Sequence, residues 1–99
     1  MIVVRNVFQA KYGKGDELVA LFKQATPMIK RHTGGRGFRT LVDLSGPMFT
    51  VVTEFEWPSL AAFEDGTKNM FADPEFGKWF AGMPDLIDHG SRDVWTVVE

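Results

Sequence analysis

Histidine can donate or accept a proton near neutral pH, and the chain has two histidines. His32 continues an apolar stripe that has the three- and four-residue spacing of one helix face. The stripe consists of Leu18, Leu21, Phe22, Ala25 and Ile29. A partly buried imidazole in this place could act as a general acid or base, so His32 is the candidate catalytic residue. We favour the alternative that a protonated His32 only stabilises the helix dipole, because local spacing fixes no carboxylate or serine beside it.

Asn6 is a polar side chain in an otherwise apolar strand pattern. It shares a predicted strand face with Ile2, Val4 and Phe8, where an amide is costly to bury unless it finds hydrogen-bond partners. In a pocket the amide could orient a carbonyl or phenol of a ligand, and we therefore predict Asn6 as a ligand-binding residue. The alternative is an asparagine whose hydrogen bonds go to backbone or water.

Aromatic side chains gather in the second half of the chain. Trp57, Phe63 and Trp79 are the predicted ligand-binding residues among them, and Phe76 and Phe80 add to the same surface. Such a set suits the stacking of a flat or hydrophobic ligand. The alternative is that the rings are simply core.

Two carboxylates alternate on one predicted strand face, at Glu54 and Glu56. Carboxylates spaced in this way could abstract a proton from an activated carbon. We favour a structural interpretation, in which they blunt an exposed strand or pair with Arg5 and Arg39 across a dimer interface.

The elements that must position these side chains follow one another with little chain between them. Strand patterns cover residues 2–11, 37–44, 48–55 and 91–98. A helix pattern covers residues 16–33, with Pro27 expected to kink it and glycines to end it. Helical spacing returns at 60–71, and Asp73 followed by Pro74 predicts a fresh helix start that runs to Pro84. Residues 86–90 are expected to be connecting chain.

This order predicts one α+β domain over residues 1–99, a ferredoxin-like βαββαβ unit with an antiparallel four-stranded sheet. Both faces of the sheet are predicted to be apolar, whereas one layer of helices covers only one face. We therefore expect a homodimer that forms through the other sheet face.

Composition excludes several classes of partner. The net charge is −2 and the basic residues are scattered, so neither nucleic acid nor an anionic membrane is expected. The first residues reach Arg5 too early for the apolar core of a signal peptide, and no run is long enough to span a bilayer. There is no cysteine and no metal-binding or phosphate-binding motif. We expect a cytoplasmic protein with no metal and no cofactor.

Three stretches resemble the dimeric α/β-barrel superfamily, most closely its NIPSNAP-like and antibiotic-biosynthesis-monooxygenase-like branches. They are Val4-Arg5 followed by residues 11–14, Gly46-Pro47 with Val51-Val52, and residues 56–60. The resemblance implies two βαββαβ subunits whose sheets pack face to face to form a dimeric α/β barrel, with a pocket between sheet and helices in each subunit. It also implies functions that range from cofactor-free monooxygenases and isomerases to haem-degrading enzymes.

Some haem-degrading members carry an asparagine on the first strand, a tryptophan at the end of the third strand and a histidine on the second helix. Asn6 and Trp57 match the first two positions. Residues 76–80 occupy the region of the third and contain no histidine, which argues against haem degradation by that arrangement.

Three functions agree with these observations. The first is a homodimer that binds a small apolar or aromatic ligand between sheet and helices. The second is a cofactor-independent monooxygenase or isomerase acting on a polycyclic, phenolic or lactone substrate, with Asn6 and Trp57 positioning it and His32 or an arginine stabilising an oxyanion. The third is a structural dimer within a larger assembly, whose pocket would be filled in.

Overall fold

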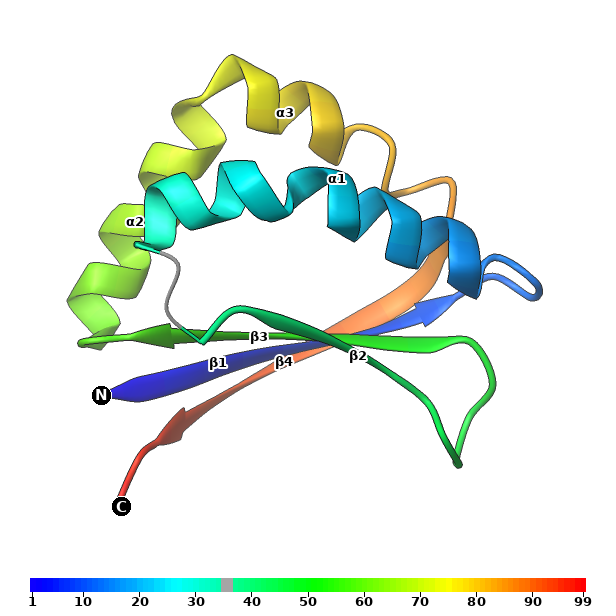
Figure 1. Ribbon diagram of the computed structural model, residues 1–99, viewed down its shortest axis with the longest axis horizontal. Helices are drawn as coiled ribbons and strands as arrows, with labels where there is room; N and C mark the ends of the chain where they lie inside the picture. The colour runs from blue at the N-terminus through cyan, green and yellow to red at the C-terminus, as the bar shows by residue number, and fades with distance from the viewer. Residues whose placement is uncertain (35–36) are drawn as a thin grey trace.

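Four antiparallel strands form one sheet in the computed structural model, which describes residues 1–34 and 37–99. The strands are β1 (Ile2–Ala10), β2 (Arg39–Val42), β3 (Thr50–Trp57) and β4 (Ile87–Thr96). Their order across the sheet is β2-β3-β1-β4 (Figure 1). This order confirms the expected ferredoxin-like α+β fold and the central place of the first strand.

Three helices lie together on one side of that sheet (Figure 1). They are α1 (Gly15–Thr33), α2 (Leu60–Ala72) and α3 (Pro74–Phe80). We call the side of the sheet beneath them the covered face and the opposite side the open face. Two clusters of buried apolar side chains, one around Leu18 and Phe22 and one around Ile29 and Met70, pack beneath and between the helices.

Local sequence signals account for most helix ends. Gly34 adopts the left-handed conformation after α1, as the glycine pattern predicts. The Ser59 hydroxyl accepts a hydrogen bond from the Ala62 N–H at the start of α2. Asp73 accepts one from the Glu75 N–H at the start of α3, which confirms the predicted helix start before Pro74. α1 continues through Pro27 as one helix.

Several predicted boundaries were wrong. β4 begins at Ile87, inside the segment expected to be connecting chain, because Gln9 and Phe8 of β1 pair with His89 and Gly90. Tertiary pairing here overrides residues with low strand propensity. β2 and β3 are also separated by a longer loop, residues 43–49, than the predicted three-residue turn, and α3 ends at Phe80 rather than near Pro84.

The open face carries an ion-pair cluster among its apolar residues. Glu54 is only 6% exposed, and its carboxylate oxygens lie 2.8 Å from Arg5 Nε and 2.7 Å from Arg39 Nε. This agrees with the structural interpretation of the strand carboxylates, although the partners come from the same chain. Exposed Leu41 and Trp95 lie on the same face.

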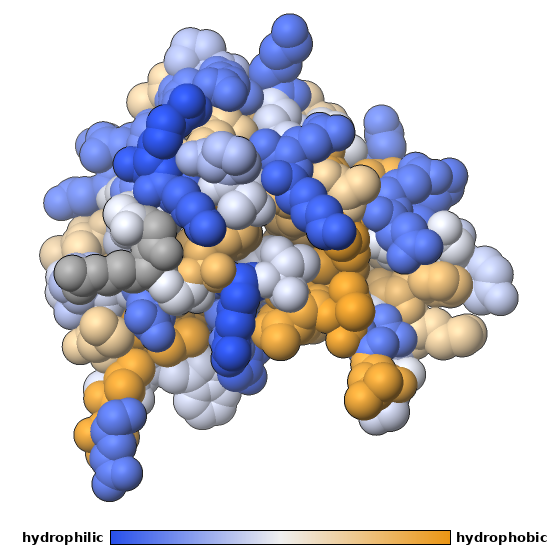
Figure 2. Space-filling model, viewed as in Figure 1, coloured by the Kyte–Doolittle hydropathy of each residue, from blue (hydrophilic) through white to orange (hydrophobic). Residues whose placement is uncertain are grey.

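Figure 2 shows hydrophilic residues over the outer surface of the helical layer and hydrophobic ones near the level of the sheet. Among the residues that the structure describes, no helix has the length and hydropathy needed to cross a membrane.

Candidate functional site

A polar row crosses the covered face of the sheet. Asn6 of β1 is directly opposite Thr53 of β3 on one side and Arg92 of β4 on the other. Its amide donates a long hydrogen bond of 3.4 Å to the Thr53 hydroxyl and accepts one of 2.7 Å from Arg92 Nε. The predicted position of Asn6 among apolar neighbours is confirmed. Its hydrogen bonds, however, go to side chains of the two adjacent strands rather than to backbone.

Apolar rows flank this polar row on the same face. Val4 lies opposite Phe55 and Val94, and Phe8 lies opposite Val51 and Gly90. A Cβ at Gly90 would lie 3.1 Å from a ring carbon of Phe8, so glycine leaves space beside that ring. The sheet therefore presents a narrow polar strip between hydrophobic margins.

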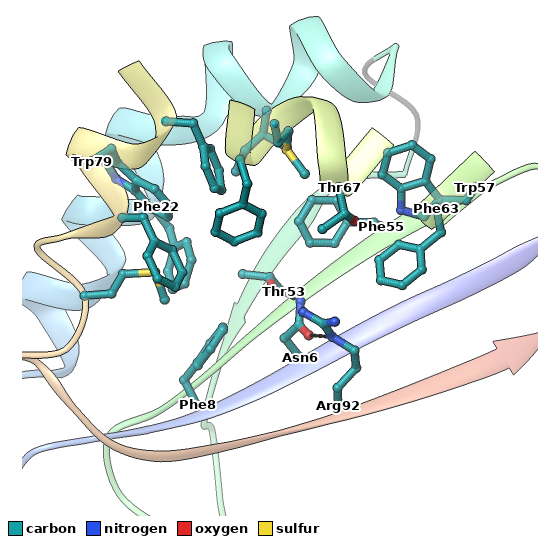
Figure 3. A pocket seen from close by; sticks show the side chains of 16 residues that line it. Asn6, Phe8, Phe22, Thr53, Phe55, Trp57, Phe63, Thr67, Trp79 and Arg92 are labelled. Carbon is teal, nitrogen blue, oxygen red and sulfur yellow. Dashed lines mark hydrogen bonds between the residues drawn. The ribbon is translucent and has the colours of Figure 1, made fainter. Parts of the chain in front are cut away.

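A cavity lies between this strip and the helices. Its volume is about 90 Å³, and aromatic rings form most of its wall. Figure 3 shows Phe22 and Trp79 on one side, Trp57 and Phe63 on the other, and Asn6, Thr53 and Arg92 on the sheet between them. An adjoining hollow of about 540 Å³ shares Asn6, Phe8 and Arg92 with the cavity and extends along β4.

Trp57, Phe63 and Trp79 all line the cavity, as does Asn6, so the four predicted ligand-binding residues are brought together. The rings of Trp57 and Phe63 meet edge to face with centroids 6.0 Å apart. The Arg92 guanidinium carbon lies 5.4 Å from the centroid of Phe63, which is a cation–π contact. The Trp79 indole N–H donates to the Leu21 carbonyl oxygen at 2.7 Å and so ties α3 to α1.

Gly66 fixes the position of the Trp57 ring. A Cβ at Gly66 would overlap the outer edge of the indole, so the ring packs directly on the backbone of α2. Trp57 is 5% exposed as a result. In the sequence this glycine is a weak point in a helix pattern, whereas the fold uses it for close packing of a cavity wall.

His32 does not line the cavity. Its Nε2 lies 3.0 Å from Asp73 Oδ2, and Arg31 lies 2.8 Å from Glu75, so the end of α1 is tied to the start of α3. The hydrogen bond from His32, with that from the Glu75 N–H, holds the pKa of the Asp73 carboxyl below its ordinary value. Local spacing did not reveal this carboxylate, because it comes from a segment 41 residues away. The catalytic role of His32 stays a prediction.

No group of three or more histidine, cysteine or acidic side chains with metal-binding geometry occurs within residues 1–34 and 37–99. α3 has the sequence PEFGKWF and carries no histidine. The helix therefore offers no imidazole to a haem iron in the arrangement considered above.

Three polar residues of the cavity were not predicted from the sequence. Arg92 and Thr53 are the neighbours of Asn6 in register, and Thr67 of α2 lines the cavity above them. Strand alternation places Arg92 on the same face as Val94 and Thr96, and helical spacing places Thr67 four residues after Phe63. Both signals were present in the sequence, but only the pairing of β4 with β1 places Arg92 beside Asn6, and only the packing of α2 over the sheet brings Thr67 to the same cavity.

Similarity to known proteins agrees with this architecture. A NIPSNAP family protein from Agrobacterium tumefaciens has a structure that superimposes with a TM-score of 0.88 at 17% identity, covering 99% of this chain and 93% of that one. A putative antibiotic biosynthesis monooxygenase from Deinococcus radiodurans gives 0.75 at 16% identity, with 100% and 94% covered. At these identities the likeness concerns the fold.

No curated protein matches the chain by sequence. The family model described as antibiotic biosynthesis monooxygenase matches residues 1–81, which include β1, β2, β3 and the helical layer. The chain therefore belongs to the antibiotic biosynthesis monooxygenase family.

Proposed function

We propose that this protein binds a small, flat, mainly aromatic ligand in the cavity between the sheet and the helices. The observation that carries the proposal is the arrangement of the wall, in which aromatic rings surround one polar strip formed by Thr53, Asn6 and Arg92. Ligand sites have this general design, since apolar walls supply affinity and a few polar groups fix orientation. A purely structural subunit would instead have a filled interior.

Size favours a ligand that extends beyond the inner cavity. Pockets for drug-sized ligands have volumes of roughly 300–1,000 Å³, whereas the inner cavity has about 90 Å³. The hollow of about 540 Å³ along β4 adjoins it and shares Phe71, Phe80 and Met83 with it, besides the three residues named above. A ligand of two or three fused rings would thus place one end among the tryptophans and the other over β4.

The positive charge of Arg92 favours a ligand that carries an oxygen atom. Arg92 Nε donates a hydrogen bond to Asn6, and the terminal guanidinium nitrogens make no hydrogen bond within the part of the chain that the structure describes. They are donors only and always charged, so they suit a phenolate, an enolate or a carboxylate. A flat phenol that ionises easily has both features.

Native mass spectrometry of the protein as purified tests the proposal first, because a retained molecule adds its mass to the subunit. Calorimetric titration with naphthol follows, using the wild type, Phe63→Ala in the cavity and Trp95→Phe on the open face as the matched control. We expect Phe63→Ala to weaken binding about tenfold or more, since a large buried contact is lost, and Trp95→Phe to leave it unchanged. Absence of binding to the wild type by both methods would refute the proposal.

A second candidate function is cofactor-independent monooxygenation, which membership of the family favours together with Arg92. In such a reaction the ionised substrate itself supplies the electrons. One oxygen atom of dioxygen enters the substrate and the other leaves as water. Arg92 would stabilise the oxyanion, and Asn6 and Trp57 would hold the substrate. An isomerase that passes through an enolate would need the same stabilisation.

Oxygen uptake with dihydroxynaphthalene, without added cofactor, tests this second function. Uptake above the spontaneous rate that falls at least tenfold in Arg92→Gln and Asn6→Ala would support it. Uptake that these variants leave unchanged would assign the residues to binding only.

We also propose that two copies of the chain associate through the open face. Support comes from Trp95, which is 54% exposed, and from Leu41 and the half-buried Val3, Val7 and Val52 on the same side of the sheet. Sedimentation of the wild type and of Trp95→Asp tests the proposal. A wild-type dimer that Trp95→Asp dissociates is expected, and a monomeric wild type at micromolar concentration would contradict it.

A further inference from the structure

We infer that Trp57 and Thr67 form a second polar position in the cavity, which receives a hydrogen-bond-accepting oxygen of the ligand. The inference rests on the proposed ligand-binding function and adds to it the chemical class of the ligand. Arg92 would bind one oxygen of the ligand near the sheet, whereas Trp57 and Thr67 would form hydrogen bonds with another oxygen next to α2. The ligand expected is therefore an aromatic ring system with oxygens at two separate places, one of them a carbonyl.

Two buried polar atoms carry this inference. Within the described residues, the side-chain nitrogens and oxygens that are buried without a hydrogen-bond partner are Trp57 Nε1 and Thr67 Oγ1. They come from different elements, β3 and α2, yet both residues line the same cavity. Buried polar groups are nearly always hydrogen-bonded, because leaving one unpaired is costly. Two such atoms in one cavity wall indicate a partner that comes from outside the chain.

The same residue types elsewhere in the molecule find partners within the chain. Trp79 also lines the cavity, but its Nε1 donates to the Leu21 carbonyl oxygen at 2.7 Å. Thr26 also lies inside a helix, and its hydroxyl donates to the Phe22 carbonyl oxygen, four residues earlier, at 3.0 Å. A helical threonine can thus satisfy itself, and Thr67 does not. Within the described residues, the buried side-chain polar atoms without a partner therefore lie where Trp57 packs on α2.

Packing keeps this position rigid. The Trp57 ring rests on Gly66 and meets Phe63, so the direction of its N–H is set by two residues of α2. Thr67 follows Gly66 directly in the same helix. Figure 3 shows Thr67, Phe63 and Trp57 side by side above the strip of Asn6 and Arg92. A fixed donor that is itself buried discriminates strongly between ligands that do and do not pair with it.

The hydrogen-bonding capacity of these two side chains indicates which ligand atom fits between them. An indole N–H only donates, and a hydroxyl donates or accepts. An oxygen that accepts from both therefore satisfies both groups, as the carbonyl oxygen of a quinone or ketone does. An aromatic hydrocarbon of the same shape would leave both unpaired.

Calorimetric titration with naphthoquinone and naphthalene, which share one ring frame, tests the inference. The chain has no cysteine, so the quinone meets no thiol. We expect the wild type to bind naphthoquinone more tightly than naphthalene. Thr67→Val, which keeps the shape and removes the hydroxyl, should reduce this preference about two- to tenfold. Thr67→Ser should retain it, and Thr26→Val, the matched control, should leave it unchanged.

The outcomes separate the inference from the function on which it rests. If the wild type binds both probes equally, or if Thr67→Val weakens both to the same extent, the cavity binds ligands and the second polar position is refuted. If the wild type binds neither naphthol nor these probes, the proposed function fails and the inference with it.

Thermal unfolding without added ligand gives an independent readout. Thr67→Val should raise the Tm, because a methyl group replaces a hydroxyl that has no partner, whereas Thr26→Val should lower it. A lower Tm for Thr67→Val would mean that the hydroxyl is paired within the protein, and would overturn the inference.

Discussion

The two faces of one sheet use polar residues in opposite ways. On the open face, Glu54 is held between Arg5 and Arg39, so charge is paired within the chain. On the covered face, the exposed Arg92 makes no hydrogen bond through its terminal nitrogens within the described residues, and Trp57 and Thr67 have buried polar atoms without partners. The strands are the same, and the side chains alternate between the faces.

The difference distinguishes polar residues that stabilise the fold from polar residues that we propose bind a ligand. Paired charges on a sheet surface contribute to stability and register. Buried polar atoms without a partner, such as those of Trp57 and Thr67, cost stability unless a ligand forms hydrogen bonds with them. Four experiments probe the comparison.

The largest effect is expected at Phe76, beneath the helical layer. Phe76 is 6% exposed and contacts the rings of Phe71, Trp79 and Phe80. Phe76→Ala should reduce the free energy of unfolding by about 3–5 kcal/mol, because it leaves a cavity among these rings. Trp95→Ala on the open face should cost less than about 1 kcal/mol in a monomer. Denaturant titration at two protein concentrations measures both. A large, concentration-dependent cost at Trp95 would mean that a second copy covers that face.

Removal of the charge at Glu54 should have a smaller effect. Burial alone acts to raise the pKa of Glu54, but the hydrogen bonds from Arg39 and Arg5 outweigh it and hold the pKa below the ordinary 4.5. Glu54→Gln should cost about 1–3 kcal/mol at pH 7, because two charge-assisted hydrogen bonds weaken.

The pH dependence follows from the direction of that shift. A lowered pKa in the folded protein stabilises it fully above pH 4.5, and this contribution is lost as the pH falls through the folded pKa. Unfolding of the wild type and of Glu54→Gln from pH 7 to pH 2 measures it. A difference between the two proteins that does not shrink below pH 4.5 would contradict the assignment.

A change at Arg92 should affect binding more than stability. Arg92→Gln removes the charge at the edge of the cavity, and we expect affinity for naphthoate, an anionic probe, to fall about three- to tenfold. Affinity for uncharged naphthalene should stay the same. Arg5→Gln, on the open face, is the matched control in the same calorimetric titrations. Equal losses for both probes would show that Arg92 acts by packing on Phe63.

The smallest effect on binding is expected at His32. It pairs with Asp73 at the edge of the helical layer, outside the cavity, so His32→Ala should lower the Tm slightly and leave naphthol affinity unchanged. If the protein turns over a phenolic substrate, the same variant measured at several pH values tests the predicted catalytic role. A loss of turnover with unchanged Tm would restore His32 to the mechanism.

The fold was predictable because its signals are local. Strand and helix periodicity, the caps at Gly34 and Asp73, and the alternation of β1 depend on neighbouring residues and gave the order of the elements. The start of β4 was not predictable in this way. Asp88, His89 and Gly90 are poor strand formers, and only pairing with β1 makes them a strand.

The site was predictable only in its aromatic part. Large aromatic side chains at helical spacing predict a hydrophobic wall, and Asn6 is a polar residue within an apolar strand pattern. Arg92 and Thr67 became part of the site through contacts that join β4, β1 and α2, which no spacing within one segment reveals. The pairing of His32 with Asp73 could not be predicted for the same reason, because the two residues are 41 positions apart in the sequence.

The placement of the three tryptophans has a practical consequence. Trp57 and Trp79 line the cavity and Trp95 stands on the open face, so the chain carries a separate optical reporter on each side of the sheet. A quinone in the cavity should quench the emission of the first two. Association of two copies should shift the emission of the third towards the blue. Trp95→Phe and Trp57→Phe assign these signals, so one emission spectrum recorded during a titration distinguishes occupancy of the cavity from burial of the open face.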